Sequence, residues 1–249
     1  MAKTLILIPS RMAATRLPGK PLLKINNLSI VSHVFKRAEE ANIGEVVVAT
    51  EDQEIFKDVL KNGGKAILTN KNHKTGTDRI FEAYEKLNIK NVDYILNLQG
   101  DEPDINKDDI INLNNFMINH DAEMGTLAAK IQDNKMMNNN NVVKVITKND
   151  LDKKNFSLAL NFTRDNSSED YQNIYHHIGI YSYKVGILKK FVSLSQTKNE
   201  IKNKLEQLRA LDNEIKINVA LAKSSPIGVD TEEDYLAIKK IMEYKISNE

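Results

Sequence analysis

Short apolar runs alternate with helical patterns through the first half of the chain, and this alternation constrains the fold more than any other feature. Continuous apolar runs such as Leu5–Ile8 and Val46–Val48 are typical of strands that are buried on both faces, as in a parallel sheet. The predicted strands are 5–8, 46–48, 66–68, 94–98 and 126–129. The predicted helices are 30–38, 52–61, 78–87 and 107–118. This order predicts an α/β fold with a mainly parallel central sheet and helices on both of its faces.

The alternation weakens after about residue 140. Two stretches, 142–146 and 158–162, have the pattern of strands with no long helix between them, which predicts a small antiparallel excursion. Helical patterns resume near Leu188, at 202–211 and at 232–244. The sequence contains no repeat and no linker-like segment, so we expect a single domain over residues 1–249.

The loop after the first predicted strand is rich in cations. Arg11, Arg16 and Lys20 lie there among small residues, a glycine and two prolines. Cations and backbone amides in such a loop can surround a phosphate chain, although a solvated basic turn is the alternative. Pro21 stands where a P-loop has Ser or Thr, and no Gly-x-Gly-x-x-Gly occurs. The loop therefore indicates a nucleotide and disfavours both a P-loop kinase and a dinucleotide-dependent dehydrogenase.

Two aspartates are candidate metal ligands. Asp101 follows the predicted strand 94–98, and open parallel sheets bind ligands at the carboxyl ends of their strands. Asp230 lies in a second turn, and one or two carboxylates plus phosphate oxygens are a typical Mg²⁺ site. Each has an ordinary alternative, because Asp101 also suits a turn cap and Asp230 also suits the start of the last helix.

Composition excludes several classes of function. The formal net charge of +1 provides no field that would attract nucleic acid or an anionic membrane. With no cysteine, the chain has no disulfide, no thiolate zinc site and no cysteine nucleophile, and its five histidines lack zinc-binding spacing. The apolar runs are too short to span a bilayer and the N-terminus does not resemble a signal peptide. We expect a cytoplasmic protein without membrane insertion and without a nucleic-acid partner.

Seven ordered blocks spread along the chain carry a resemblance to a known family. The first is the basic loop that begins at Ile8, and the other six are 48–52 (VATED), 73–79 (HKTGTDR), 97–103 (NLQGDEP), 177–181 (HIGIY), 205–209 (LEQLR) and 228–231 (GVDT). In these blocks the chain resembles the 3-deoxy-manno-octulosonate cytidylyltransferases, or CMP-Kdo synthetases. Seven blocks in order are far more specific than any one of them.

The resemblance implies a Rossmann-like nucleotidyltransferase that uses CTP and Mg²⁺. Such an enzyme transfers CMP to the anomeric hydroxyl of 3-deoxy-D-manno-octulosonate (Kdo) for lipopolysaccharide biosynthesis, and releases pyrophosphate. It also implies a homodimer formed through an excursion within residues 140–200. The implied catalytic residues are Arg11, Lys20, Asp101 and Asp230, of which the two aspartates hold the metal. The implied CTP-binding residues are Pro9, Arg11, Arg16, Lys20, Thr50, Arg79, Gln99 and Gly100.

A second set of residues is implied for the sugar. These are Arg164, His177, Tyr181, Glu206 and Gln207. Strand alternation places His177 and Tyr181 on one face, where a half-buried structural strand is the alternative. The block 205–209 likewise has a structural alternative, a leucine stripe in the core with Glu206 and Arg209 as a surface pair.

The sequence departs from the family pattern at two positions. Thr75 replaces the usual serine, and the glycine that often follows LEQLR is missing, so we expect Asn213 to take any positive φ there.

A cytidylyltransferase for 8-amino Kdo or a neuraminate is the nearest alternative function. A glycosyltransferase is disfavoured because 101–104 (DEPD) is not an Asp-x-Asp motif. A catalytically silent regulator is disfavoured because the cations and carboxylates are all present.

Overall fold

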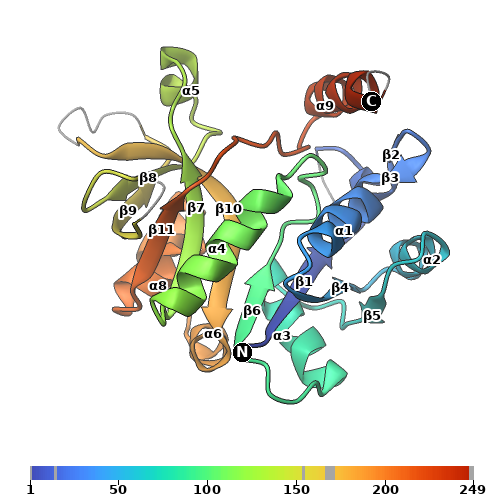
Figure 1. Ribbon diagram of the computed structural model, residues 1–249, viewed down its shortest axis with the longest axis horizontal. Helices are drawn as coiled ribbons and strands as arrows, with labels where there is room; N and C mark the ends of the chain where they lie inside the picture. Colours follow the sequence, from blue (N-terminus) through green and yellow to red (C-terminus); the bar gives the residue numbers. More distant parts are fainter. Residues whose placement is uncertain (1, 14–15, 153–154, 166–171, 247–249) are drawn as a thin grey trace. The chain divides into compact units, whose positions relative to one another are not determined.

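The computed structural model describes residues 2–13, 16–152, 155–165 and 172–246 (Figure 1). The chain forms two compact units. Unit 1 contains Lys3–Lys107 and Pro226–Glu249, and unit 2 contains Asp108–Ser225.

Unit 1 is built on a parallel sheet. Its strands are β1 (Thr4–Ser10), β4 (Gly44–Thr50), β5 (Ala66–Leu68) and β6 (Tyr94–Asn97), in the order β5-β4-β1-β6. The described pairings among these strands are all parallel, with Ile8 opposite Val48 and Leu7 opposite Asn97. All seven residues of β1 are buried, as expected for a central parallel strand. In this unit the predicted parallel sheet is confirmed.

The helices of unit 1 begin at local caps. They are α1 (Ile30–Glu40), α2 (Gln53–Lys61), α3 (Gly76–Leu87) and α9 (Glu232–Ile246). Ser29 Oγ accepts from the backbone N–H of Ser32 to cap α1, and Thr75 caps α3 in the same way. The first three helices contact the strands β1, β4 or β5. Their predicted positions are confirmed to within two residues at each end.

A small apolar cluster holds the last part of the chain in unit 1. The 3₁₀ helix η1 (Lys20–Leu22) leads into a hairpin of β2 (Lys24–Ile25) and β3 (Leu28–Ser29). Ile25 and Ile30 pack with Val229 and with Ile238 and Met242 of α9. The turn that carries Asp230 is therefore anchored beside the loop that follows β1.

Unit 2 has a mixed sheet. Its strands are β7 (Met124–Ala129), β8 (Lys144–Thr147), β9 (Ser157–Thr163), β10 (Ile174–Lys184) and β11 (Ile217–Leu221). They pair in the order β10-β7-β11-β9-β8, and β8 also pairs with β10, so the pairings close into a ring. Among the described residues of this unit only β7 and β11 are parallel.

The prediction of a mainly parallel sheet is therefore wrong for unit 2. The strands β8, β9 and β10 follow one another without an intervening helix in the described residues. A parallel connection needs a longer crossover, usually helical, whereas antiparallel neighbours do not. What the sequence indicated as a small excursion is most of this sheet, and β11 was not predicted at all.

The helices of unit 2 are mostly short. They are α4 (Lys107–Asn119, whose first residue belongs to unit 1), α5 (Asn134–Asn138), α6 (Val185–Ser193), α7 (Lys198–Asn203) and α8 (Leu208–Asp212). The predicted helix 202–211 is wrong, because Lys204 takes a left-handed conformation with φ of 53° and ends α7. The expected positive φ falls on Glu214 at 60°, whereas Asn213 has φ of −110°.

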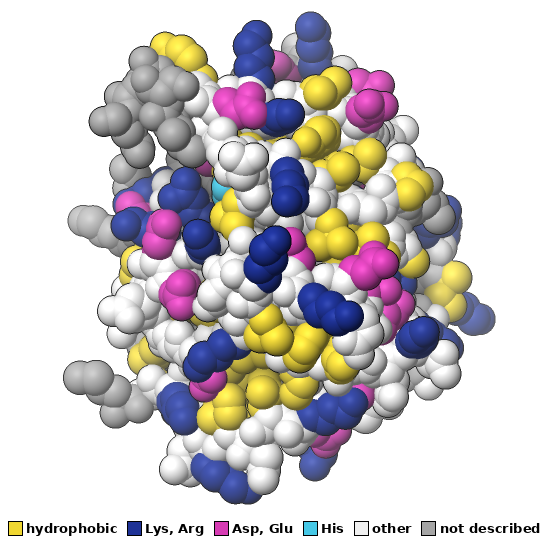
Figure 2. Space-filling model, turned by 90° about the vertical axis from the view of Figure 1, so that its right-hand side faces the viewer, with side chains coloured by type: hydrophobic (Ala, Val, Ile, Leu, Met, Phe, Trp, Pro, Cys, Tyr) yellow, Lys and Arg dark blue, Asp and Glu magenta, His cyan; other side chains and the backbone are white. Residues whose placement is uncertain are grey.

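Two observations concern the surface. Among the described residues, no helix combines the length and the apolar character that crossing a membrane requires. Acidic and basic side chains lie intermixed on the face shown in Figure 2. This mixture agrees with the near-zero net charge of the chain.

Candidate active site

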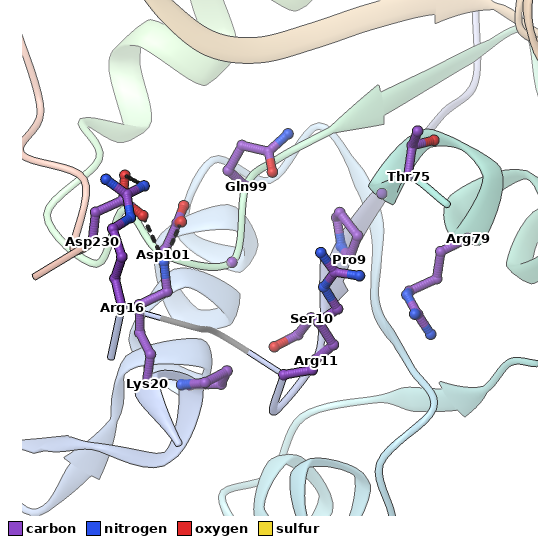
Figure 3. Close-up of a pocket in the computed structure, with 14 residues that line it drawn as sticks. Pro9, Ser10, Arg11, Arg16, Lys20, Thr75, Arg79, Gln99, Asp101 and Asp230 are labelled. Atoms are coloured by element: carbon purple, nitrogen blue, oxygen red, sulfur yellow. Dashed lines mark hydrogen bonds and ion pairs between the residues drawn. The ribbon is translucent and has the colours of Figure 1, made fainter. Parts of the chain in front are cut away.

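A pocket of about 330 Å³ lies in unit 1, beyond the carboxyl ends of β1 and β6 (Figure 3). It is lined by Pro9, Ser10, Arg11, Ala13, Arg16, Lys20, Pro21, Thr75, Gly76, Arg79, Gln99, Gly100, Asp101 and Asp230. The structure therefore brings together every residue that the sequence placed in the nucleotide and metal sites, except Thr50. This is the edge at which open parallel sheets bind ligands.

Four charged side chains gather at one end of this pocket. Lys20 Nζ lies 2.7 Å from Asp101 Oδ2 and 3.2 Å from Asp230 Oδ1. Arg16 Nη2 lies 2.9 Å from Asp230 Oδ2. Burial by itself would lower the pKa of Lys20, but the two carboxylates outweigh it and raise the pKa. The ammonium therefore stays charged at neutral pH.

The backbone explains why residues so far apart in sequence meet here. Gly19, at φ of 72°, turns the chain into η1, where Lys20 is the first residue. The backbone N–H of Val229 donates to the carbonyl of Asp101 at 2.9 Å, which joins the two turns that carry the aspartates. Thr231 Oγ1 accepts from the N–H of Asp234 at the start of α9. Asp230 therefore lies at the start of α9, as the alternative expected, but Thr231 is the cap and the carboxylate of Asp230 faces the cations.

Asp52 holds the loop that follows β1. Its Oδ2 accepts from the backbone N–H of Met12 at 2.7 Å, between the pocket residues Arg11 and Ala13. Asp52 stands at the N-cap of α2 but makes no side-chain cap hydrogen bond. Its carboxylate thus accepts a hydrogen bond from the loop and does not cap its own helix.

Thr50 lies beneath the pocket rather than in its wall. The residue is completely buried, and its Oγ1 accepts from the backbone N–H of Asp52 at 3.1 Å. Because Thr50 is the last residue of β4, its side chain supports the turn that carries Asp52. The sequence placed Thr50 correctly at a strand end but could not tell that the side chain faces inward.

Arg79 lines the pocket but is paired with protein groups. Its guanidinium donates to Glu51 and, at 2.7 Å, to Thr69 Oγ1, and the residue is 2% exposed. In Figure 3 Arg79 lies on the opposite side of Pro9 and Arg11 from Asp101. The family resemblance implied that Arg79 binds CTP; in the structure the partly buried carboxylate of Glu51 already holds its guanidinium in place.

Glycines keep the middle of the pocket open. A Cβ on Gly100 would lie 2.9 Å from the carbonyl oxygen of Pro9, and a Cβ on Gly76 would lie 3.1 Å from Pro9 Cγ. Any side chain at either position would push against the end of β1. These close approaches explain why glycine stands in the QGD and TGT segments of the sequence.

The sequence analysis missed two polar residues here. Ser10 lines the pocket, and its buried Oγ has no hydrogen-bond partner among the described residues. Glu102 Oε2 is likewise buried without a partner in the described part of the chain. Burial raises the pKa of Glu102 to about 8, and the neighbouring charge of Asp101 adds to the effect. In the sequence, only their positions next to the predicted site residues Arg11 and Asp101 could have indicated Ser10 and Glu102.

The pocket carboxylates suit a hard metal ion. One ammonium contacts an oxygen of each aspartate, so the two oxygens converge on a common cation position. Carboxylate oxygens are the ligands that Mg²⁺ prefers. Among the described residues no group of three or more His, Cys, Asp and Glu side chains has the geometry to hold a metal by itself. Substrate oxygens or water would have to complete the coordination.

In unit 2 the structure brings together His177, Tyr181 and Glu206. A bulge in β10 interrupts the expected alternation, because Ile178 pairs with Leu127 whereas Tyr181 pairs with the next residue, Thr126. The rings of His177 and Tyr181 nevertheless lie 5.4 Å apart. Tyr181 Oη is buried and has no hydrogen-bond partner among the described residues. Burial raises the pKa of Tyr181 far above its usual range, with a contribution from Glu206.

The segment that carries Glu206 and Gln207 is held by a buried ion pair. Arg209 donates from Nε and Nη2 to Glu200 at 2.9 and 2.6 Å, and both side chains are 4% exposed. Glu206 Oε1 lies 3.6 Å from the same guanidinium, and Gln207 is buried. The structural alternative is thus confirmed in part, since Leu205 and Leu208 are buried and Glu206 pairs with Arg209, but Arg209 lies in the core and not on the surface.

Arg164 contacts a loop of unit 2. Its Nη1 donates to the carbonyl of Asn141 at 3.0 Å, and the buried Lys144 donates to the carbonyl of Arg164 at 3.1 Å. No contact between Arg164 and the other predicted sugar-binding residues is seen among the described residues.

The buried His177 is expected to make the free energy of unfolding of unit 2 depend on pH. Thr126 Oγ1 donates to the carbonyl of Ile180 at 2.7 Å, so Nε2 of His177, 3.0 Å away, donates to Thr126. Burial lowers the pKa of His177 to about 3, and the nearby His176 adds to this. Between pH 6.5 and about 3 the unfolded chain therefore binds a proton that the folded chain does not. We expect the free energy of unfolding to rise with pH across this window, and we expect His177→Asn to reduce the slope.

Urea denaturation at a series of pH values measures this slope. Tyr181→Phe is the matched control, because it alters the neighbouring ring without adding or removing a group that titrates in acid. Equal slopes for the wild type and His177→Asn would contradict the assignment of a neutral buried imidazole.

Comparison with known proteins gives matches over nearly the whole chain. The family described as Cytidylyltransferase matches residues 5–217. A protein of Rhodopseudomonas palustris (strain BisB18) named 3-deoxy-manno-octulosonate cytidylyltransferase is 44% identical over 241 residues, which cover 96% of this chain and 98% of the relative. A protein of the same name from Thermodesulfovibrio yellowstonii is 42% identical, with the same coverage.

A solved structure is also similar. It is that of CMP:2-keto-3-deoxy-manno-octonic acid synthetase complexed with CTP. The TM-score is 0.88 at 33% sequence identity, and the match covers 98% of this chain and 100% of that one.

Proposed function

The chain belongs to the cytidylyltransferase family, and from that membership we propose that it transfers CMP from CTP to the anomeric hydroxyl of 3-deoxy-manno-octulosonate (Kdo) and releases pyrophosphate. This is a nucleotidyltransferase reaction of lipopolysaccharide biosynthesis. The observation that carries the proposal is the pocket of unit 1, in which a basic loop faces two aspartates at the carboxyl ends of parallel strands. The full-length similarity to proteins named for this activity supports the choice of CTP and Kdo.

The basic loop is suited to the triphosphate. Arg11, Arg16 and Lys20 line one pocket, and the raised pKa of Lys20 keeps its charge. Fixed cations hold phosphate oxygens and stabilise the negative charge that develops on departing pyrophosphate. Pro9, Gln99 and Gly100 line the same pocket and form the floor against which we place the nucleoside.

The reaction needs little covalent help from the protein. The anomeric oxygen of Kdo attacks the α-phosphorus in line, the bond from that phosphorus to the bridging oxygen breaks, and pyrophosphate leaves. Positioning and charge neutralisation supply most of the rate in such transfers. Asp101 and Asp230 are the residues that would hold Mg²⁺, which when bound polarises the α-phosphate and lowers the pKa of a coordinated hydroxyl.

We assign the sugar to the polar residues of unit 2. Tyr181 Oη is buried without a partner among the described residues, and such a group is stabilised when a ligand hydroxyl or a water satisfies it. His177 is neutral, and Glu206 and Gln207 supply further hydrogen-bonding groups. Arg164 is proposed for the sugar carboxylate, since a guanidinium binds a carboxylate through two parallel hydrogen bonds.

A coupled assay of pyrophosphate release tests the function. The folded protein is supplied with CTP, Mg²⁺ and one sugar acid at a time: Kdo, its 8-amino analogue or N-acetylneuraminate. We expect release with Kdo that stops when Mg²⁺ is chelated. Preference for another sugar acid would keep the reaction class and change the substrate. A folded protein that binds CTP but releases no pyrophosphate with any of the three would overturn the proposal.

Asp52→Ala tests the role of the basic loop. Loss of the hydrogen bond from Met12 removes about 1–1.5 kcal/mol of loop support. We therefore expect KM for CTP to rise by about five- to tenfold while kcat changes little. Asp52→Asn keeps an accepting oxygen and is expected to restore most of the affinity. The exposed Glu54 of α2 provides the control Glu54→Gln. An unchanged KM in Asp52→Ala would show that the loop does not need this anchor.

We also propose a homodimer that forms through the segment 140–200, and a location in the cytoplasm, where CTP is available. Light scattering on the purified protein tests the first point. A monomer at micromolar concentration would contradict it.

A further inference from the structure

The side chains at the charged end of the pocket balance one another's charge. Asp101 and Asp230 face Lys20, and Asp230 also faces Arg16. Two carboxylates thus meet two cations within hydrogen-bonding distance. The side chain of Lys20 is 12% exposed, whereas those of Asp230 and Arg16 are 50% and 59% exposed. The most enclosed member of the group is the ammonium that lies between the two acids.

A divalent cation would compete with this ammonium for the same oxygens. Lys20 Nζ accounts for one oxygen of each aspartate. A neutral cluster offers a metal ion little net attraction, because the attraction of the two carboxylates is offset by the repulsion of the two cationic side chains. The competition ends only when these cationic side chains move to another anion. A nucleotide triphosphate in this pocket is such an anion.

The side chains can make this move without the backbone. Lys20 is held at its main chain by the turn at Gly19, with the N–H of Leu22 donating to the carbonyl of Gly19 at 2.9 Å. Its ammonium ends a flexible stem of four carbons and has three donors. The side chain of Arg16 is mostly exposed and forms an ion pair with Asp230. Both cations line the pocket together with Arg11.

We propose that Lys20 and Arg16 neutralise Asp101 and Asp230 in the nucleotide-free protein and move to the triphosphate when it binds, so that the nucleotide and the divalent cation bind with positive coupling. This inference rests on the proposed function, because it takes the two aspartates as metal ligands. Lys20 has two roles in it, since it excludes the metal before the nucleotide arrives and binds phosphate afterwards. The coupling is reciprocal, so each ligand strengthens the other by the same factor.

Binding of Mn²⁺, measured by electron paramagnetic resonance without nucleotide, tests the first half. Lys20→Met keeps the apolar stem and removes the charge, and we expect it to bind Mn²⁺ about tenfold more tightly than the wild type, within the usual range for such couplings. Arg16→Met, at an exposed side chain where folding is not in question, is expected to tighten binding by a smaller factor. Lys24→Met removes the same charge from an exposed position on β2 and is the control.

A non-hydrolysable CTP analogue with a methylene group between its α- and β-phosphorus atoms tests the second half. After correction for Mn²⁺ bound by the free analogue, we expect the analogue to tighten Mn²⁺ binding in the wild type by at least tenfold. We expect the analogue to tighten Mn²⁺ binding by a smaller factor in Lys20→Met, because in this variant no ammonium competes with the metal for the carboxylates before the analogue binds.

The variant Asp101→Asn separates the two ways of failing. If it abolishes Mn²⁺ binding while Lys20→Met and Arg16→Met bind Mn²⁺ like the wild type without nucleotide, the metal assignment holds and the coupling through these cations is wrong. If Asp101→Asn leaves Mn²⁺ binding unchanged with and without the analogue, the metal assignment fails, and the coupling fails with it.

Discussion

Replacing Asp101 with Asn is expected to reduce the rate of pyrophosphate release by about three orders of magnitude. The carboxylate lies at the carboxyl end of β6, within 2.7 Å of Lys20, in the pocket proposed for the triphosphate. A metal contact of this kind contributes several kcal/mol of transition-state stabilisation, and each 1.36 kcal/mol is about tenfold in rate. Asparagine has the same shape and can still accept a hydrogen bond from Lys20, so the loss tests charge rather than packing.

Steady-state kinetics with saturating CTP and Kdo measures this effect. The exposed Glu85 of α3 offers a matched control, because Glu85→Gln also removes one negative charge from unit 1 and lies outside the pocket lining. A thermal melt of each variant separates loss of activity from loss of fold. A rate for Asp101→Asn within tenfold of the wild type would remove Asp101 from the catalytic residues.

The second large effect is expected from Glu200, which lies in the core of unit 2. Glu200→Gln removes the carboxylate that accepts two hydrogen bonds from the guanidinium of Arg209, 3% exposed, and leaves only the longer contact to Glu206, at 3.6 Å, as a counter-charge. Breaking a buried ion pair from one side costs about 3–5 kcal/mol of unfolding free energy. Glu200 also completes the capping box of α7 with Thr197. The stacking of Arg209 over Phe191, at 4.7 Å, is not expected to compensate for the loss.

Urea denaturation measures the unfolding free energy. The pair of Arg37 and Glu40 on α1 is the control, since both side chains are more than a third exposed and Glu40→Gln is expected to change stability by less than about 1 kcal/mol. Since Arg209 lies two residues after Gln207 and contacts Glu206, we also expect a higher KM for Kdo in any Glu200→Gln protein that folds. Equal stability of the wild type and Glu200→Gln would contradict a structural role for this ion pair.

Much of the candidate site was predictable because its signals are local. The apolar run of β1 fixes a buried strand, and Arg11, Arg16 and Lys20 follow it within a few residues. Parallel strands carry their following loops to one edge of the sheet, so Asp101 after β6 was expected at the same edge. Asp230 was placed there only through the family resemblance. In the structure its turn is held by Val229, which donates to the carbonyl of Asp101.

The sequence-based predictions were wrong where strand pairs or ion pairs join residues that are far apart in the sequence. The sheet of unit 2 closes through β8 and β10, and no local pattern shows which strands will pair. Arg209 was expected on the surface because nothing near it in sequence shows that it becomes buried with Glu200, and nothing near Arg79 shows that Glu51 holds its guanidinium. The break at Lys204 is also tertiary, since a lysine with positive φ is uncommon and propensity alone favours a continuous helix.

The sequence by itself determined the parallel sheet of unit 1, its helices, the basic loop and the family to which the chain belongs, because these depend on spacing and on motifs within short segments. Only the tertiary structure decided which charged groups of the pocket are paired. Lys20 meets Asp101 and Asp230 across 81 and 210 residues of chain, and burial together with these two acids sets its pKa. Interactions of this kind depend on which groups are enclosed together, and that is fixed only when the whole unit has packed.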